Sequence, residues 1–142
     1  MHKIMHIALL STLLAGLPAL AQAADTKVLD HHVANMKSGD LQAVLSDYAP
    51  DVVIVTPAGM VSPNGVFIGK VIRKLFTALT AKDNLPGNKT MEVKYEPLSA
   101  DTTLMRWVQF KGTPKEVSGY DVFVIRGGKV VFQSVTVNPA KK

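Results

Sequence analysis

The segment that most constrains the fold is KEVSGYDVFVIRGGKVVFQSVTV, residues 115–137. Two runs rich in valine and aromatic residues flank the turn RGG, and apolar and polar side chains alternate along each run. Such alternation is typical of strands with one buried face, and a glycine pair between two such runs predicts a tight hairpin. The segments 89–98 and 102–112 alternate in the same way. The C-terminal part of the chain is therefore expected to form an antiparallel sheet.

The N-terminal half carries helical patterns instead. Apolar residues recur at helical spacing in residues 25–40, 41–48 and 69–82, which predicts three helices. The β-branched run at 51–56 predicts one buried strand, and DNLPGN at 83–88 is expected to break the chain before the later strands. This order predicts an α+β fold in which three N-terminal helices pack in a curved, mostly antiparallel sheet.

The first 23 residues have the pattern of an export signal. The basic Lys3, the apolar run IALLSTLLAGLPAL and the AQA at Ala21–Ala23 follow the order of a cleavable signal peptide. The apolar run is shorter than the roughly 20 residues that a membrane-spanning helix needs. Cleavage after Ala23 leaves residues 24–142 as a single domain, periplasmic or secreted, with no stable membrane anchor. A retained anchor is the alternative, and the cleavage site argues against it.

The composition argues against several classes of protein. The chain has no cysteine, so packing rather than disulfides must stabilise it. Its formal charge of +5 is dispersed, and the absence of a dense basic patch with interleaved aromatic residues argues against nucleic-acid binding. No nucleotide or metal motif is present in the sequence, so no cofactor and no metal site is predicted. A copper(I) site on His32 and Met36 is the weakest alternative, because single methionines usually fill gaps in cores.

Four segments occur in an order that resembles one known superfamily. They are MKSGDLQAVLSDYAPDVVIVTP (36–57), Gly69 with Phe76, SGYDVFVIRGGKVVF (118–132) and QSVTVN (133–138). In this order they are similar to the SnoaL-like branch of the nuclear-transport-factor-2-like superfamily. The resemblance implies a cone, in which a bent sheet wraps three helices and a pocket between them is open at one end. It also implies a homodimer formed through the outer face of the sheet.

The ketosteroid-isomerase pattern of that superfamily gives an expectation for three positions. Such enzymes use an aspartate base just before the proline that follows the first strand, together with a tyrosine and a late-strand carboxylic acid. The resemblance places His32 at the tyrosine position, Asp121 at the acid position and Thr56 at the base position. A threonine hydroxyl cannot abstract a proton near neutral pH, so steroid-type isomerisation is disfavoured.

His32 and Asp121 are the candidate catalytic pair, and each has an alternative interpretation. His32 lies on the apolar stripe of its helix and is predicted to face inward, whereas the adjacent His31 is turned about 100° toward solvent. His32 is expected to line the pocket and hydrogen-bond with Asp121, to be a core residue without chemistry, or to ligate a metal. Asp121 lies mid-strand, where an unpaired carboxylate is costly. It either faces the pocket or, on the convex face, pairs with a base such as Arg106.

Six further residues are expected to bind the ligand, namely Met36, Tyr48, Val55, Thr56, Phe76 and Trp107. The predicted pocket suits a small, largely apolar organic ligand, and acid/base chemistry of the isomerase or dehydratase type is the enzymatic hypothesis. The alternative is a non-catalytic module, either a ligand carrier or a dimerising interaction domain. An open cavity favours binding or catalysis, and a cone plugged by Phe76, Trp107 and Met36 favours the module.

Overall fold

The computed structural model describes residues 17–140, with side-chain surroundings from residue 26 onward. Residues 1–16 of the predicted export signal lie outside the described residues, and residues 17–23 belong to the first helix. Within the described range, no helix has both the length and the apolar character needed to cross a membrane. In chain order the elements are α1 (Leu17–Ser38), α2 (Leu41–Ser46), β1 (Tyr48–Val55), β2 (Val66–Ile68), the 3-10 turn η1 (Gly69–Val71), α3 (Ile72–Leu79), α4 (Leu85–Thr90), β3 (Glu92–Pro97), β4 (Thr102–Gln109), β5 (Val117–Arg126) and β6 (Lys129–Val137).

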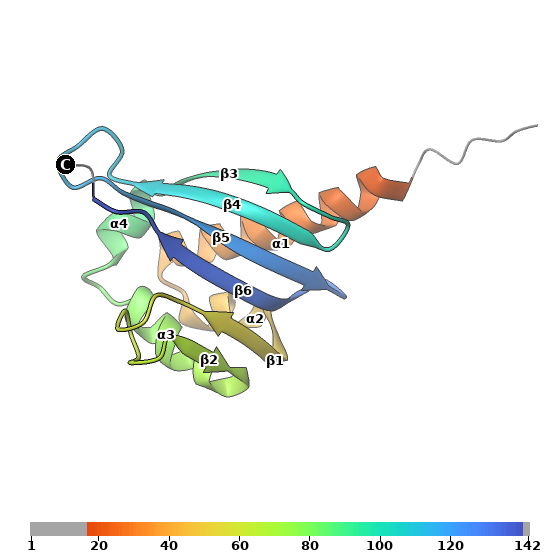
Figure 1. Cartoon of the computed structure of the whole chain (residues 1–142), viewed down its shortest axis with the longest axis horizontal. Helices are drawn as coiled ribbons and strands as arrows, with labels where there is room; N and C mark the ends of the chain where they lie inside the picture. The colour runs from red at the N-terminus through yellow and green to blue at the C-terminus, as the bar shows by residue number, and fades with distance from the viewer. Residues whose placement is uncertain (1–16, 141–142) are drawn as a thin grey trace, which may run out of the picture.

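The described strands form one six-stranded sheet in the order β2-β1-β6-β5-β4-β3 (Figure 1). Neighbouring strands run antiparallel except β1 and β6, which are parallel. The hairpin predicted at RGG joins β5 to β6, and Gly127 and Gly128 adopt φ values of 56° and 72° there. Positive φ at both central residues favours glycine, because a side chain would be strained. The mostly antiparallel sheet predicted from the alternation is confirmed.

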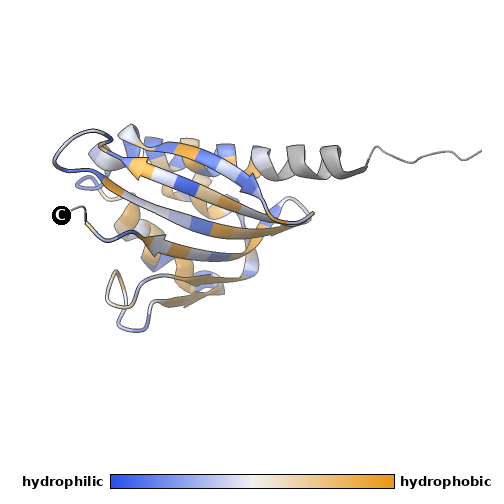
Figure 2. Ribbon diagram, turned by 45° about the horizontal axis from the view of Figure 1, so that its top comes forward, coloured by the Kyte–Doolittle hydropathy of each residue, from blue (hydrophilic) through white to orange (hydrophobic). Residues whose placement is uncertain are grey.

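The helices lie on one face of the curved sheet (Figure 1). Hydrophobic and hydrophilic residues alternate along the strands in Figure 2, so each strand presents an apolar side to the helices. Buried side chains from both halves of the chain form one core between these layers. The predicted α+β architecture is confirmed. The largest fully buried side chains are those of Leu29, Val44, Val52, Ile54, Phe67, Leu75, Phe76, Phe123 and Val130.

The segment expected to break the chain, residues 83–88, instead leads into the short helix α4. Pro86 lies in the first turn of α4, where its missing N–H has no helical partner to lose. Leu85 packs against the end of α1, since a Cβ on Gly39 would lie 2.6 Å from Leu85 Cδ2. The described residues thus contain four α-helices rather than the three predicted.

Strand β1 begins at Tyr48, three residues before the predicted start at Asp51. Tyr48 pairs with Val130 of β6, and the register between the two strands shifts before Val53. Pro50 lies within this irregular part, where a missing backbone N–H breaks no regular ladder. Tyr48 is consequently a buried strand residue, and the end of the second predicted helix was placed too late.

Candidate functional site

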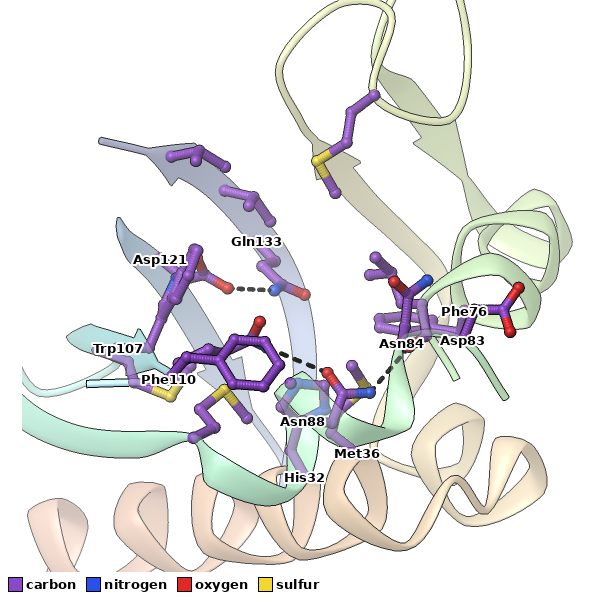
Figure 3. Close-up of a pocket in the computed structure, with 18 residues that line it drawn as sticks. His32, Met36, Phe76, Asp83, Asn84, Asn88, Trp107, Phe110, Asp121 and Gln133 are labelled. Atoms are coloured by element: carbon purple, nitrogen blue, oxygen red, sulfur yellow. Dashed lines mark hydrogen bonds between the residues drawn. The ribbon is translucent and has the colours of Figure 1, made fainter. Parts of the chain in front are cut away.

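A cavity of about 240 Å³ lies between the helices and the sheet and opens to solvent (Figure 3). Its wall comes from α1, α3, α4 and the strands β4 to β6, together with residues of the segments that connect β1 to β2, α3 to α4, α4 to β3 and β4 to β5. Residues far apart in the chain therefore build it together. The lining residues are His32, Met36, Met60, Phe76, Leu79, Asp83, Asn84, Gly87, Asn88, Met91, Met105, Trp107, Gln109, Phe110, Asp121, Gln133, Val135 and Val137.

Asp121 lies on the inward face of β5 and is 6% exposed. Trp107 Nε1–H donates to its Oδ1 at 2.9 Å, and Gln133 Nε2–H donates to its Oδ2 at 2.8 Å (Figure 3). The alternative pairing of Asp121 with Arg106 on the convex face is wrong, because Arg106 binds Glu96 instead. A carboxylate has more lone pairs than these two donors use, so Asp121 can still accept a hydrogen bond or a proton from the cavity.

Tyr48 and Gln133 connect Asp121 to His32. The Tyr48 hydroxyl donates to Gln133 Oε1 at 2.6 Å, and it lies 3.4 Å from His32 Nδ1. All four side chains belong to residues that are at most 6% exposed. In the described part of the chain no hydrogen bond joins His32 directly to Asp121. The expected direct contact is therefore replaced by a chain of two intervening side chains, which exists because β1 and β6 are neighbours in the sheet.

Three aromatic rings surround the His32 imidazole. Its centroid lies 5.7 Å from the ring of Tyr48, 5.9 Å from that of Phe76 and 5.8 Å from that of Phe123, each in an edge-to-face arrangement. Such packing fixes the plane of the ring and excludes water from it. Because Nδ1 is directed to Tyr48, Nε2 is the nitrogen that remains for a molecule in the cavity.

Burial moves the pKa values of the two ionisable groups in opposite directions. It raises the pKa of Asp121 from 3.8 to about 6, although the hydrogen bonds from Trp107 and Gln133 favour the carboxylate. Burial lowers the pKa of His32 from 6.5 to about 4, with a further contribution from the charge of His31. At neutral pH the cavity therefore presents a carboxylate and a neutral imidazole.

Asp47 is a second buried carboxylate near His32, close to the same ring nitrogen that faces Tyr48. Its Oδ1 lies 2.5 Å from His31 Nδ1, and its Oδ2 lies 4.0 Å from His32 Nδ1. Within the described residues Oδ2 has no hydrogen-bond partner. Burial raises the pKa of Asp47, and the hydrogen bond with His31 opposes this shift. The predicted exposure of His31 is confirmed, since its side chain is 55% exposed, but the sequence did not predict its pairing with Asp47.

Methionine and aromatic side chains make up much of the apolar wall. Every methionine beyond residue 5 reaches the cavity. Methionine side chains adapt their shape and make favourable contacts with aromatic rings. The cavity therefore offers soft, apolar contacts from several directions. The residues concerned are Met36, Met60, Met91, Met105, Phe76, Trp107 and Phe110.

Phe110 reaches the cavity by breaking the alternation of β4. Strict alternation puts Phe110 on the face opposite to Met105 and Trp107, yet all three line the cavity. Phe110 has φ of 52°, a left-handed conformation that is uncommon for a residue with a side chain. This local backbone conformation turns the chain after β4 so that the ring faces inward.

Five of the eight predicted site residues line the cavity, namely His32, Met36, Phe76, Trp107 and Asp121. Their roles in ligand binding or catalysis stay predictions. Tyr48 lies behind His32, where it joins the hydrogen-bonded chain rather than the cavity wall.

Val55 and Thr56 lie elsewhere, and the expectation that they line the pocket is wrong. Val55 is 38% exposed on the outward side of β1, because its neighbour Ile54 occupies the inward position of the alternating strand. Thr56 is buried, but its hydroxyl donates to the backbone oxygens of Pro57 and Gly65 at 3.3 and 3.4 Å. This side chain fixes the start of the loop between β1 and β2.

Gln133, Gln109 and Asn88 are polar lining residues that the sequence analysis did not single out. Gln109 Nε2–H donates to Asn88 Oδ1 at 3.2 Å, and Asn88 Nδ2–H donates to the backbone oxygen of Leu79 at 2.9 Å. A signal for Gln133 exists, since it is a polar residue opposite the core residue Phe123 in the hairpin register. Asn88 carries no such signal, because its helix was expected to be a loop.

Candidate metal ligands are sparse in this region. Across the described residues, no three histidine, cysteine, aspartate or glutamate side chains lie close enough together to hold a metal ion.

No protein-family model matches the chain, and no curated protein matches it. Solved structures do match. An NTF2-like (nuclear-transport-factor-2-like) protein of unknown function from Burkholderia xenovorans superposes with a TM-score of 0.66 at 15% identity, over 87% of this chain and 89% of that one. A SnoaL-like protein of unknown function from Burkholderia thailandensis gives a TM-score of 0.62 at 18% identity, over 83% and 98%. The chain has the NTF2-like cone fold.

A third structure with the same fold is that of TerC, co-crystallised with polyporic acid. It superposes with a TM-score of 0.60 at 19% identity, over 81% of this chain and 92% of TerC. The NTF2-like and SnoaL-like resemblance predicted from the sequence is confirmed at the level of the fold. An NTF2-like fold does not by itself define an activity, so the function must come from the cavity.

Proposed function

We propose that this NTF2-like protein binds a small, largely apolar organic molecule in the cavity and that Asp121 accepts a proton from it. The observation that carries the proposal is the position of Asp121. Its carboxylate is 6% exposed, is held by two donors and lines a mainly apolar cavity. Burying an ionisable group costs free energy of folding. Buried ionisable groups with shifted pKa values in a cleft are therefore typical of functional sites.

The pKa of Asp121 suits a general base. A base works best when its pKa lies near the working pH, because it is then both ionised and able to hold the proton. Burial raises the pKa of Asp121 to about 6. The neutral His32 imidazole is the second group that faces the cavity. The Tyr48 hydroxyl gives its proton to Gln133, so the N–H of His32 is at Nδ1, facing Tyr48, and Nε2 can accept one hydrogen bond. This pair supports proton transfer of the isomerase or dehydratase type.

Cavity size and one similar structure support a small-molecule ligand. The cavity of about 240 Å³ exceeds the roughly 150 Å³ cavity that binds benzene in an engineered protein. TerC, which shares the fold, was co-crystallised with polyporic acid. The open cavity also favours ligand binding over a plugged, purely dimerising module. A carrier without chemistry would use the same cavity but would not need a base.

Hydrogen–deuterium exchange on 2-tetralone, an apolar two-ring ketone with an acidic C–H group, tests the proposal. In D₂O the protein is expected to accelerate exchange at that carbon, as followed by NMR. Asp121→Asn is expected to slow this exchange by about 10²-fold, because a positioned base contributes about 10²–10⁴-fold. Asp51→Asn, at an exposed position of β1, is the matched control and is expected to behave as wild type.

Two outcomes separate the enzyme from its rivals. Equal exchange rates in wild type and Asp121→Asn would contradict the role of Asp121 as base. Binding of 2-tetralone without accelerated exchange, seen as thermal stabilisation, would favour the carrier.

We also propose that the protein forms a homodimer through the outer face of its sheet. Outward-facing apolar residues of four neighbouring strands lie in register there, with Val53 opposite Ile68 and Phe132, and Phe132 opposite Val124. Ile68 at the sheet edge is 57% exposed. Val53, Phe132 and Val124 are partly exposed, and together with Ile68 they form an apolar row that supports association with another protein surface, here a second copy of the chain.

Export to the periplasm or the medium is part of the proposal and rests on the pattern of residues 1–23. N-terminal sequencing of the protein recovered outside the cytoplasm is expected to begin at Ala24. An intact N-terminus on the exported protein would contradict cleavage.

A further inference from the structure

The charge of the cavity wall is opposite to that of the whole protein. The chain carries 16 lysine and arginine residues against 11 acidic ones. Among the described residues no lysine or arginine lines the cavity, and its charged lining residues are Asp83 and Asp121. Asp83 is exposed, whereas Asp121 is buried. An anion that enters the cavity therefore meets carboxylates and no compensating positive charge.

The nitrogen donors of the wall are already engaged with the protein. Trp107 Nε1 and Gln133 Nε2 donate to Asp121. Gln109 Nε2 donates to Asn88, whose own amide nitrogen donates to a backbone oxygen of α3. A ligand carboxylate would find the second hydrogens of these amides, which carry no full positive charge. The wall thus offers little positive charge and few free donors to offset the negative charge of an anionic ligand.

Acceptors, in contrast, remain available to a ligand. A carboxylate has about four lone-pair sites, and the donors Trp107 and Gln133 occupy one on each oxygen of Asp121. Gln109 Oε1 accepts no hydrogen bond in the described structure, and it lies beside Gly87, where a Cβ would approach it to 2.7 Å. A ligand that brings a hydrogen-bond donor therefore finds partners without breaking any contact in the wall.

The volume and the apolar wall restrict the carbon skeleton of the ligand. A cavity of about 150 Å³ holds benzene, so the cavity of about 240 Å³ has room for about two fused rings. Methionine sulfur and aromatic edges pack favourably against flat rings. Four methionines and three aromatic residues in the wall provide such contacts.

We infer that the cavity selects neutral ring compounds, of the size of two fused rings, whose hydroxyl group donates a hydrogen bond to Asp121, and that it rejects carboxylates and phosphates. The inference rests on the proposed function and names its class of ligand. It brings an acidic O–H of the ligand to the carboxylate that is proposed to act as base, as in a phenol or an enol.

Three compounds of similar shape test the selection: 2-naphthol, which donates a hydrogen bond, naphthalene, which does not, and 2-naphthoate, an anion at pH 7.5. Binding to the purified protein is measured by NMR titration. We expect 2-naphthol to bind most tightly and to exceed 2-naphthoate by about tenfold or more, because a hydrogen bond to a charged acceptor is among the stronger ones. The exposed control Asp51→Asn is expected to keep this order.

Two further measurements assign the selection to Asp121. In Asp121→Asn the preference for 2-naphthol over 2-naphthoate is expected to fall to about threefold or less. In wild type at pH 5 the preference for 2-naphthol over 2-naphthoate is expected to fall to the same extent, because Asp121, whose pKa is raised to about 6, takes up a proton. Its contacts Trp107 and Gln133 do not titrate, and His32 and Tyr48, which reach it through Gln133, stay neutral. The pH measurement needs no variant, so it remains decisive if Asp121→Asn does not fold.

The outcomes distinguish this inference from the proposed function. If naphthalene binds and 2-naphthoate binds as tightly as 2-naphthol, the inference is overturned and small-molecule binding stands. If none of the three compounds binds, the proposed function fails and the inference fails with it. A preference for 2-naphthol that persists in Asp121→Asn and at pH 5 would overturn the role of Asp121 in selection.

Discussion

At the scale of single residues, Asp121 and His32 have opposite effects on stability as the pH changes. Burial raises the pKa of Asp121 from 3.8 to about 6, so the folded protein holds this proton more tightly than the unfolded chain. Its contribution to stability is complete below pH 3.8 and is lost as the pH rises through 6. Burial lowers the pKa of His32 from 6.5 to about 4, so its contribution is present above pH 6.5 and is lost as the pH falls through 4. Between about pH 4 and pH 6, the stability that Asp121 loses as the pH rises is therefore largely offset by the stability that His32 gains.

Asp121→Asn is expected to remove the contribution of Asp121 to this pH dependence of stability. Relative to wild type, the free energy of unfolding of the variant should rise by about 2 kcal/mol between pH 4 and pH 6, since one pKa unit corresponds to about 1.4 kcal/mol. Urea unfolding at both pH values measures the change, and Asp51→Asn is the exposed control. A difference between Asp121→Asn and wild type that does not vary with pH would contradict the raised pKa of Asp121.

Tyr48 is expected to stabilise the fold through its hydroxyl. The hydroxyl donates to Gln133 at 2.6 Å within the core, so Tyr48→Phe leaves a buried acceptor without its donor. The free energy of unfolding should fall by about 1–3 kcal/mol, as measured by urea unfolding. Tyr95→Phe is the matched control and should lose less free energy of unfolding. The Tyr95 hydroxyl donates to the exposed Asp30, to which water can donate a hydrogen bond instead. Equal losses in the two variants would rule out burial as the cause.

The inward positions of His32 and Asp121 could be predicted, because helix and strand periodicity decide which face a residue occupies. The link between them could not. Tyr48 and Gln133 are 85 residues apart in the chain, and they meet because β1 pairs in parallel with β6. Asp47 was missed for the same reason, since its contacts with the two histidines depend on how the start of β1 lies against α1.

At the scale of elements, β5 positions the indole of Trp107 by omitting a side chain. Gly119 is buried on the inward face of β5, two residues before Asp121. A Cβ on Gly119 would lie 2.4 Å from Trp107 Cζ2 and 2.1 Å from the backbone oxygen of Thr136. Because position 119 carries no side chain, the indole of Trp107 can lie against β5 and its N–H can reach Asp121. A Cβ there would also clash with the sheet backbone, which cannot move without disturbing the strand pairing.

Gly119→Ala is therefore expected to displace Trp107 and to lower the free energy of unfolding by about 1–3 kcal/mol, the usual cost of overpacking. Trp107 is the single tryptophan of the chain, so its fluorescence and near-ultraviolet circular dichroism report the displacement directly. Ser134→Ala, on the outward side of the neighbouring strand β6, is the control and should leave both signals unchanged. An unaltered tryptophan signal in Gly119→Ala would contradict the positioning role.

The elements themselves could be predicted to different degrees. The long strands and their hairpin follow from alternation and from the glycine pair at Gly127 and Gly128, which are local properties. Helix α4 could not be predicted, because proline and glycine within LPGN usually break helices. Its stability comes from tertiary packing of Leu85 against Gly39, which no local pattern contains.

At the scale of the whole molecule, the resemblance implied the cone and a pocket inside it, but the sequence could not decide whether side chains leave that pocket open. Whether side chains fill a cone depends on their rotamers and on local backbone exceptions such as Phe110 with φ of 52°. Val55 and Thr56 were misplaced because the resemblance gives approximate positions, and the alternation of β1 decides the actual face.

The proposed homodimer makes a prediction about molecular mass in solution. Sedimentation equilibrium is expected to give twice the monomer mass for wild type and the monomer mass for Val124→Glu, which puts a charge into the apolar row on the outer sheet face. Gln42→Glu, an exposed change of the same charge on α2, should remain dimeric. A monomeric wild type would contradict the dimer without affecting the cavity.

The methionine methyl groups allow the most direct test of the central claim that the cavity is a ligand site. All four methionines beyond residue 5 line it, from α1, β4 and two connecting segments. In protein with ¹³C-labelled methionine methyls, addition of 2-naphthol is predicted to shift the signals of Met36, Met60, Met91 and Met105 along one common binding curve. In Asp121→Asn the affinity for 2-naphthol obtained from that curve should be lower. Binding of 2-naphthol that leaves these four signals in place would contradict the account.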